Sequence, residues 1–213
     1  MAQILRTEKL KIVNKIIGSD IVVSNNLTMF IEEKEWTVIS LPHGGGKTTL
    51  YRAILDQINP VSGKVIYHNL DKIDAYDREK FIRKNITAVP EIPSIESNFT
   101  VRDWTSLQIE LFRPSKYKSR LEEFIILLEK EKINPEKHLS QLTLLEMRKV
   151  EIAFSIVSDT ILIMCDDIDV GLSKSDLENL GEFLEKFNKI KAILIFTSNA
   201  FWNKYAKKVI RDL

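Results

Sequence analysis

The chain has 213 residues, enough for one substantial domain with its own core. Its 31 lysines and arginines nearly balance its 30 aspartates and glutamates, and this balance predicts no general affinity for nucleic acid or acidic membrane surfaces. The single cysteine cannot form an internal disulfide and suits a reducing compartment. Since no apolar run approaches the length of a spanning helix, we expect a soluble protein that would reach a membrane only through a partner.

The first half of the chain mixes strands with short helices. We predict antiparallel strands in LKIV and IVVSNNLTMFI, joined by a turn at residues 18–20, Gly18, Ser19 and Asp20. A buried strand in EWTVISL is followed by a helix from Gly46, in which apolar residues recur at Leu50, Ile54 and Ile58. Then come a strand in KVIYHN, a short helix in YDREKFIRKN and a strand in ITAV.

The second half predicts mainly helices and fully apolar strands. Residues 100–132 are chiefly helical, and TLLEMRKVEIAFSIVS and KSDLENLGEFLEKFNK are helices. TILIMCD and KAILIFTS are buried strands. Helices that alternate with fully apolar strands indicate a largely parallel sheet covered on both faces.

The stretch LPHGGGKTTL, between a predicted strand and a predicted helix, has the composition of a phosphate-binding loop. Glycine N–H groups can close around phosphate oxygens, a lysine can reach the terminal phosphates, and a threonine hydroxyl can hold magnesium. Leu41 stands where the strict pattern has its first glycine. The alternative is a glycine-rich turn whose lysine faces solvent. The candidate nucleotide-binding residues are Pro42, His43, Gly44, Gly45, Gly46, Lys47, Thr48 and Thr49. For His43, a histidine of a surface turn is the favoured interpretation.

A second acidic segment comes after another buried strand. TILIMCDD ends in Asp166 and Asp167, at the edge of a parallel sheet where ligands bind. One carboxylate can hold magnesium through water, and the next can polarise an attacking water. The alternative is a strand followed by an ordinary acidic turn.

These segments, in this order and spacing, resemble the ATP-binding cassette (ABC) ATPases. LPHGGGKTTL is similar to the family's GPNGAGKTTL, VPEIPSIESNFTVRDW to its Q-loop region VPQEPSLFPNLTVREN, and DDIDVGLS to DEPTSGLD. MRKVEIAFSI matches the helix after the family's LSGGQ signature. Counting back places the signature on LTLLE, residues Leu142, Thr143, Leu144, Leu145 and Glu146.

The resemblance implies ATP and Mg²⁺ as cofactors, with Thr48 and Asp166 holding the metal. It also implies catalytic positions, each carrying an altered residue. Glu91 replaces the Q-loop glutamine, Asp167 the catalytic glutamate and Ser198 the switch histidine.

Two further departures weaken the resemblance. Leu144 and Leu145 replace glycines that in the family approach the partner's ATP, although Thr143 keeps the hydroxyl of the family's serine. No aromatic residue occurs near Ile16 and Ile17, where the family stacks a tyrosine on adenine.

The resemblance implies an α/β fold, namely a P-loop NTPase core with a mainly parallel sheet and an N-terminal antiparallel β portion. Residues 1–213 would form a single nucleotide-binding domain, with a helical subdomain at about residues 90–155. The implied function is the ATP-binding subunit of an ABC-type membrane transport complex, with slow or impaired hydrolysis. The alternatives are a structural or regulatory pseudo-ATPase beside an intact ATPase, and a soluble P-loop ATPase unrelated to membranes.

The implied partners are an integral membrane permease subunit and a second nucleotide-binding domain, in a homodimer or a heterodimer. We expect no nucleic-acid partner and no direct membrane insertion. The chain would then be cytoplasmic and peripheral, held at the inner face of a membrane by its partner subunits.

Overall fold

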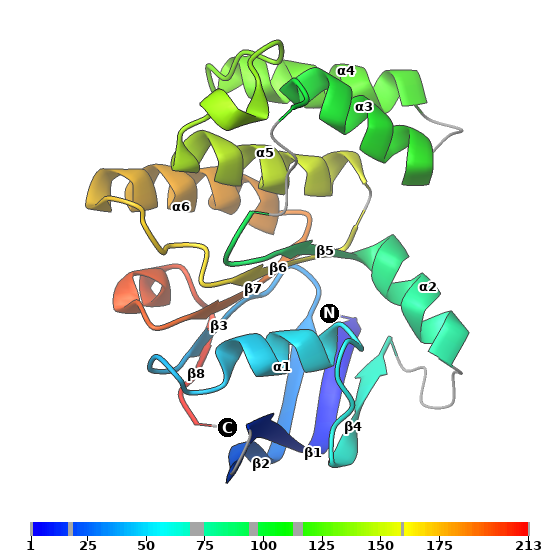
Figure 1. Cartoon of the computed structure of the whole chain (residues 1–213), viewed down its shortest axis with the longest axis vertical. Coiled ribbons are helices and arrows are strands. Elements are labelled where there is room, and N and C mark those ends of the chain that lie inside the picture. Colours follow the sequence, from blue (N-terminus) through cyan, green and yellow to red (C-terminus); the bar gives the residue numbers. More distant parts are fainter. Residues whose placement is uncertain are drawn as a thin grey trace.

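A computed structural model describes residues 2–16, 19–68, 75–93, 98–112, 117–158 and 160–212 of the protein. Figure 1 shows a central sheet with helices on one side and, on the other side, further helices and a second sheet. The central sheet is parallel and the second is antiparallel. The predicted α/β class is therefore confirmed.

Five strands form the parallel sheet in the described part of the chain, in the order β5-β6-β7-β3-β8. Their bounds are β3 (Trp36–Ser40), β5 (Ile86–Val89), β6 (Leu162–Asp166), β7 (Ala192–Thr197) and β8 (Lys208–Ile210). The first four were predicted from apolar runs. The sequence analysis missed β8, a short edge strand beside β3 whose residues are only half-buried. All five carboxyl ends lie at one edge, because every neighbouring pair runs parallel.

The parallel sheet separates two apolar cores, because side chains of a strand alternate between its faces. In β6, Ile163 and Cys165 pack with α5 (Leu144–Val157) and α6 (Lys174–Asn188). Leu162 and Met164 face the opposite core, with helix α1 (Lys47–Ile54) and the antiparallel sheet. The side chains of β6 are therefore buried on both faces.

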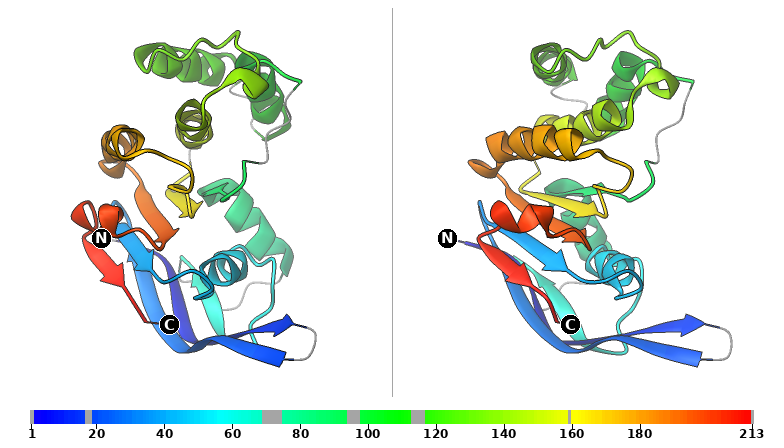
Figure 2. Two further views of the ribbon diagram at one scale, coloured as in Figure 1. Left: turned by 60° about the vertical axis from the view of Figure 1, so that its left-hand side comes forward. Right: turned by 90° about the vertical axis from the view of Figure 1, so that its left-hand side faces the viewer.

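The remaining helices are α2 (Ala75–Asn85), α3 (Val101–Phe112), α4 (Tyr117–Lys130) and the short 3₁₀ helices η2 (Leu139–Gln141) and η3 (Ala200–Lys204). Both views of Figure 2 place α3 and α4 at the end of the molecule away from the antiparallel sheet. These helices lie within the predicted helical subdomain, whose status as part of a single domain stays a prediction. In the described residues, no helix combines the length and hydropathy needed to cross a bilayer.

The antiparallel sheet contains β1 (Gln3–Ile16), β2 (Ser19–Glu32) and β4 (Ser62–Tyr67), in the order β2-β1-β4. The predicted antiparallel pairing is confirmed, but β1 begins well before the predicted LKIV. A bulge with Lys9 at φ 48° interrupts the apolar alternation, which hides the first half of the strand. The predicted turn is wrong for Ser19 and Asp20, which pair with β1 as part of β2; Gly18 lies outside the described residues.

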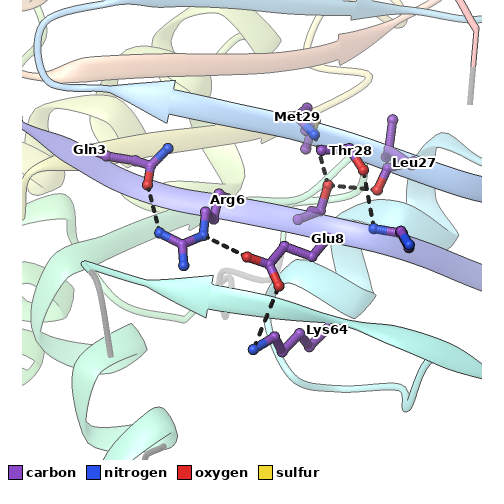
Figure 3. Close-up of polar contacts among 9 residues, drawn as sticks. Gln3, Arg6, Glu8, Leu27, Thr28, Met29 and Lys64 are labelled. Atoms are coloured by element: carbon purple, nitrogen blue, oxygen red, sulfur yellow. Dashed lines mark hydrogen bonds and ion pairs between the residues drawn. The ribbon is translucent and has the colours of Figure 1, made fainter. Parts of the chain in front are cut away.

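Polar contacts hold the two strands together around this bulge (Figure 3). The buried hydroxyl of Thr7 donates to the carbonyl of Leu27, and it accepts from the N–H of Met29 at 3.0 Å. The N–H of Lys9 donates to the hydroxyl of Thr28. Side-chain hydroxyls thus provide partners for backbone groups at the place where the bulge interrupts the regular pairing.

Helix α1 ends at Ile54, four residues before the predicted end at Ile58. Asp56 adopts a left-handed conformation with φ 57°, and the N–H of Gln57 bonds back to the carbonyl of Arg52. This closing turn satisfies one of the last carbonyls of the helix. Ile58 still packs against the apolar core, so its spacing reflected burial rather than helix.

A buried guanidinium ties α5 to the segment after β5. Arg148 donates Nη1 to the carbonyl of Pro90 at 2.7 Å and Nη2 to the carbonyl of Glu91. Its Nη1 also lies 3.0 Å from Oε2 of Glu151, and both side chains are buried. Burial raises the pKa of Glu151 to about 7, and the adjacent Arg148 charge offsets only part of that effect.

We expect the pair to make folding stability depend on pH. A carboxyl whose pKa rises on folding stabilises the protein below its unfolded pKa of about 4.5, and that contribution is lost as pH rises through about 7. At about 1.4 kcal/mol per unit, the loss is about 3 kcal/mol. Glu151→Gln should therefore gain stability relative to the unmodified protein between pH 4.5 and pH 8, measured by urea unfolding. Glu178→Gln on the exposed face of α6 is the control, and equal pH profiles of the two variants would contradict the expectation.

Candidate nucleotide site

The loop between β3 and α1 has the backbone of an anion cradle. Gly44 and Gly46 have φ of 75° and 88°, a left-handed conformation that side chains disfavour. The N–H of Gly45 bonds the carbonyl of Pro42 at 3.0 Å, which tightens the turn. Gly46 precedes α1 without any side-chain cap on the helix N-terminus. The positive end of the helix dipole is therefore available to an anion.

Gly46 is also required by a contact that the sequence did not reveal. A Cβ at this position would lie 2.0 Å from Cγ1 of Val23, which β2 carries over the loop. The bulged hairpin therefore packs directly on the phosphate-loop backbone. Local pattern gave no signal for this contact, since Val23 belongs to the antiparallel sheet and Gly46 follows a strand of the parallel one.

Leu41 does not distort the loop. Its N–H bonds the carbonyl of Thr197 at 3.0 Å, continuing the pairing of β3 with β7. Its side chain is buried in the core around α1. The backbone of Leu41 is not left-handed, so this position does not need the glycine of the strict pattern.

Lys47 is buried, with 4% of its side chain exposed. Its Nζ lies 3.3 Å from the carbonyl of Pro42, 3.5 Å from the carbonyl of Leu41 and 3.3 Å from Oδ2 of Asp167. The alternative of a lysine facing solvent is therefore wrong. The ammonium points into the loop that it would share with a phosphate.

The two aspartates after β6 are buried carboxylates rather than an exposed acidic turn. Asp166 and Asp167 are 2% and 6% exposed, and Oδ1 of each has no hydrogen-bond partner among the described residues. Burial raises the pKa of Asp166 to about 6, against a hydrogen bond from Thr48, and the neighbouring Asp167 raises it further. Burial likewise raises the pKa of Asp167 above its usual range, against the charge of Lys47.

These oxygens fit a magnesium ion. Mg²⁺ typically takes one or two protein oxygens plus phosphates and water, and Thr48 with Asp166 supplies such a pair, including an unpartnered buried oxygen. Glu91 lines the same cavity of about 410 Å³ as Thr48 and Asp166, from the segment held by Arg148. No larger group of His, Cys, Asp and Glu side chains suited to a metal occurs in the described residues.

Ser198 comes directly after β7 and meets the phosphate loop through His43. Its Oγ lies 3.2 Å from Nε2 of His43, and both residues are exposed. The preceding Thr197 donates its hydroxyl to Asp169. The structure therefore brings together the loop, both aspartates, Glu91 and Ser198, while Thr49 is half-buried at the start of α1 and Pro42 is exposed.

The signature-like segment lies apart from these residues within one chain. It starts α5 on one side of the parallel sheet, whereas α1 lies on the other (Figure 1). Thr143 and Glu146 form a capping box: the N–H of Thr143 donates to Glu146 at 2.7 Å, and the N–H of Glu146 donates to Thr143 at 3.2 Å. Leu142 and Leu145 pack against the core, and Leu144 lies beside Gly171. The assignment of this segment as a signature stays a prediction.

Lys137 forms an ion pair with Glu146 at the start of α5. Its Nζ lies 2.8 Å from Oε2 of Glu146. Partial burial disfavours the charged carboxylate, but hydrogen bonds from Lys137 and Thr143 outweigh it and lower the pKa of Glu146. The expected adenine position at Ile16 and Ile17 is not tested, since Ile17 lies outside the described residues and the side chain of Ile16 is not described.

The fold and this site together define an α/β protein with a glycine-rich phosphate loop and two acids at the carboxyl edge of its sheet. A family model described as "ABC transporter" matches residues 24–169. The match covers more than half of the chain. The protein therefore belongs to the ABC transporter family, as the sequence resemblance predicted.

Curated relatives include ATP-binding proteins of import systems. The chain is 27% identical to the zinc import ATP-binding protein ZnuC of Rickettsia conorii, over 87% of this chain and 71% of that protein. It is 29% identical to the methionine import ATP-binding protein MetN of Chlamydia caviae, over 88% of this chain. It spans only 56% of the length of that relative.

Solved structures agree on the fold. The protein superimposes on cbiO1 of Clostridium perfringens, part of the ABC transporter complex cbiONQ, with a TM-score of 0.84 and 21% identity over 99% of this chain and 85% of that one. It superimposes on MJ0796, a bacterial ABC transporter cassette solved as a dimer, with a TM-score of 0.82 and 20% identity, over 97% and 93% of the two chains. Both share the architecture of this chain.

We expect Gly46→Ala to destabilise the protein by at least about 2 kcal/mol, because the new methyl group meets Val23 and the backbone is left-handed. Gly44→Ala is the matched control, since it has a similar φ but open space around the added Cβ. It should cost about 1 kcal/mol. Urea unfolding followed by circular dichroism measures both, and equal losses would show that the Val23 contact is unimportant.

Proposed function

We propose that this protein is the ATP-binding subunit of an ABC-type membrane transport complex and binds Mg-ATP at the loop of residues 42–49. One observation carries the proposal. A buried lysine, a buried pair of aspartates and an uncapped helix N-terminus converge on one glycine-rich loop. Buried charges with incomplete partners are costly in a purely structural role, and they are useful where a charged ligand completes them.

The residues then divide the work of binding. Backbone N–H groups of the loop surround the phosphates, and Lys47 exchanges its carbonyl contacts and Asp167 for the β and γ phosphates. Thr48 and Asp166 hold magnesium, which neutralises charge on the phosphates. Asp167, released from Lys47, keeps an oxygen free to orient a water beside the terminal phosphate.

Two partners are proposed from the family and from the relatives' names. We propose a membrane permease, contacted through the segment around Glu91, and a second nucleotide-binding domain that closes over the bound ATP. The chain would sit at the cytoplasmic face. The names of the relatives favour an import system. Residues 1–213 would act as a single nucleotide-binding domain, with the helical subdomain at about residues 90–155.

Hydrolysis should be slow, because this chain departs from the family pattern at two places: at its own phosphate loop and at the start of α5, which would face the partner's ATP. At its own loop, the carboxylate of Asp167 is one methylene shorter than a glutamate. At the start of α5, a carboxylate already occupies the helix N-terminus that would face the partner's ATP. This second observation favours the alternative function, a non-hydrolysing structural or regulatory pseudo-ATPase that binds nucleotide weakly or not at all and acts beside an intact ATPase.

Binding of Mg-ATP should depend on Lys47. Removing its charge-assisted contact to phosphate in Lys47→Ala should weaken binding by at least about 1 kcal/mol. Isothermal titration calorimetry on the purified chain measures the effect. Lys174→Ala, at the exposed start of α6, is the control that should bind like the unmodified protein. No heat from the unmodified protein at millimolar ATP would argue against the proposed function.

Turnover of the unmodified protein should lie below about 1 per second. Asp167→Glu should raise it by about tenfold, because the longer side chain reaches the attacking water as a general base. A steady-state phosphate-release assay measures both, and Lys47→Ala should abolish the signal. Brisk turnover of the unmodified protein, lost in Lys47→Ala, would show that aspartate at position 167 is fully competent.

A further inference from the structure

The contact between His43 and Ser198 joins two segments that are far apart in sequence. The strands that carry them, β3 and β7, pair in parallel with Ser40 opposite Thr197. Beyond this last pair, the chain turns into the phosphate loop on one side and into Ser198 on the other. Nε2 of His43 then meets Oγ of Ser198 at 3.2 Å. This contact places the imidazole at the rim of the loop on the side of β7.

A phosphate bound at this rim would need a hydrogen-bond donor to offset the carboxylates beside it. The neighbouring strand β6 leads into Asp167 and Asp169, whose carboxylates repel a phosphate. Thr197 cannot compensate, since its hydroxyl is donated to Asp169 at 2.8 Å. Lys47 lies deeper, held to the loop carbonyls. On this side of the loop, the imidazole of His43 and the hydroxyl of Ser198 can both donate a hydrogen bond.

The other two histidines of the chain lie elsewhere. His68 comes after β4 in the antiparallel sheet, and His138 caps η2 in the helical part. Only the histidine of the phosphate loop is positioned to contact a nucleotide bound there.

We propose that His43, positioned by Ser198, contacts the terminal phosphate of ATP and makes the site prefer ATP over ADP. The proposal rests on the proposed function and adds to it a residue that distinguishes the two nucleotides. Lys47 and the loop backbone bind phosphates that ATP and ADP share, whereas a side chain on the outer rim contacts only the phosphate that ADP lacks. Ser198 is a positioning residue, because it acts through the imidazole.

Affinity for two nucleotides tests the proposal. Calorimetry with magnesium compares a non-hydrolysable ATP analogue with ADP, on the unmodified protein and on His43→Ala. We expect His43→Ala to weaken binding of the analogue roughly tenfold, the loss of one hydrogen bond to a charged group, and binding of ADP less than about twofold. Ser198→Ala should show the same selectivity with a smaller loss. Equal losses for both nucleotides, or no loss, would overturn the proposal.

Exchanging the two residues tests whether the imidazole contacts the phosphate or the pair only holds the two segments together. The double variant His43→Ser with Ser198→His keeps a serine and a histidine in contact but exchanges their positions. We expect it to restore the preference for the ATP analogue, and a preference that stays lost counts against the proposal. Phosphorus NMR gives an independent readout: the γ-phosphate resonance of the bound analogue should move in His43→Ala while the α resonance stays.

The failures of the two ideas are distinguishable. If the unmodified protein binds neither nucleotide, the proposed function fails and this inference fails with it. If the unmodified protein binds both and His43→Ala changes them alike, only the role of His43 is wrong. Thermal unfolding of each variant verifies that the exposed substitutions leave the fold intact.

Discussion

The parallel pairing of β6, β7 and β3 is the constraint on which the candidate site depends. Each strand delivers a different group at or just beyond its last paired residue: Asp166 and Asp167 at the end of β6, Ser198 after β7 and the glycine-rich loop after β3. Because parallel strands end at the same edge, strand pairing alone brings together groups that are more than a hundred residues apart in sequence. The apolar side chains that bury both faces of these strands hold the edge in place.

The charged groups at that edge lower the free energy of unfolding of the protein when no ligand is bound. Lys47, Asp166 and Asp167 are removed from water, and two carboxylate oxygens have no partner in the described part of the chain. An unpaired buried polar group costs about 1–3 kcal/mol. The protein tolerates this cost because two apolar cores on either side of the sheet hold the strands. A charged ligand with a cation would return the lost interactions, so this region is expected to be where a nucleotide stabilises the fold most.

The fold was predictable where apolar patterns are local, and not where distant residues decide. The buried strands β5, β6 and β7 were found from their apolar runs. The end of α1 was misplaced because the apolar spacing of Ile58 continues after the left-handed turn at Asp56. The edge strand β8 has too few buried residues to give a pattern.

The site shows the same division. The loop and the acids lie in motifs that the sequence displays, so their residues could be named in advance. The burial of Lys47 and the meeting of His43 with Ser198 depend on strand pairing, which no local pattern contains. The tie between Arg148 and the Glu91 segment was missed for the same reason.

The packing of Val23 against Gly46 implies that the phosphate loop depends on the hairpin of β1 and β2 for its conformation. A peptide of the loop alone, or the loop transplanted into another parallel sheet, would lack the hairpin side chain that closes over its backbone. Recombination between related cassettes would face the same limit, because a crossover between residues 23 and 46 separates the two partners. The unit that can be inherited or engineered intact is therefore the hairpin together with the loop, rather than the motif by itself.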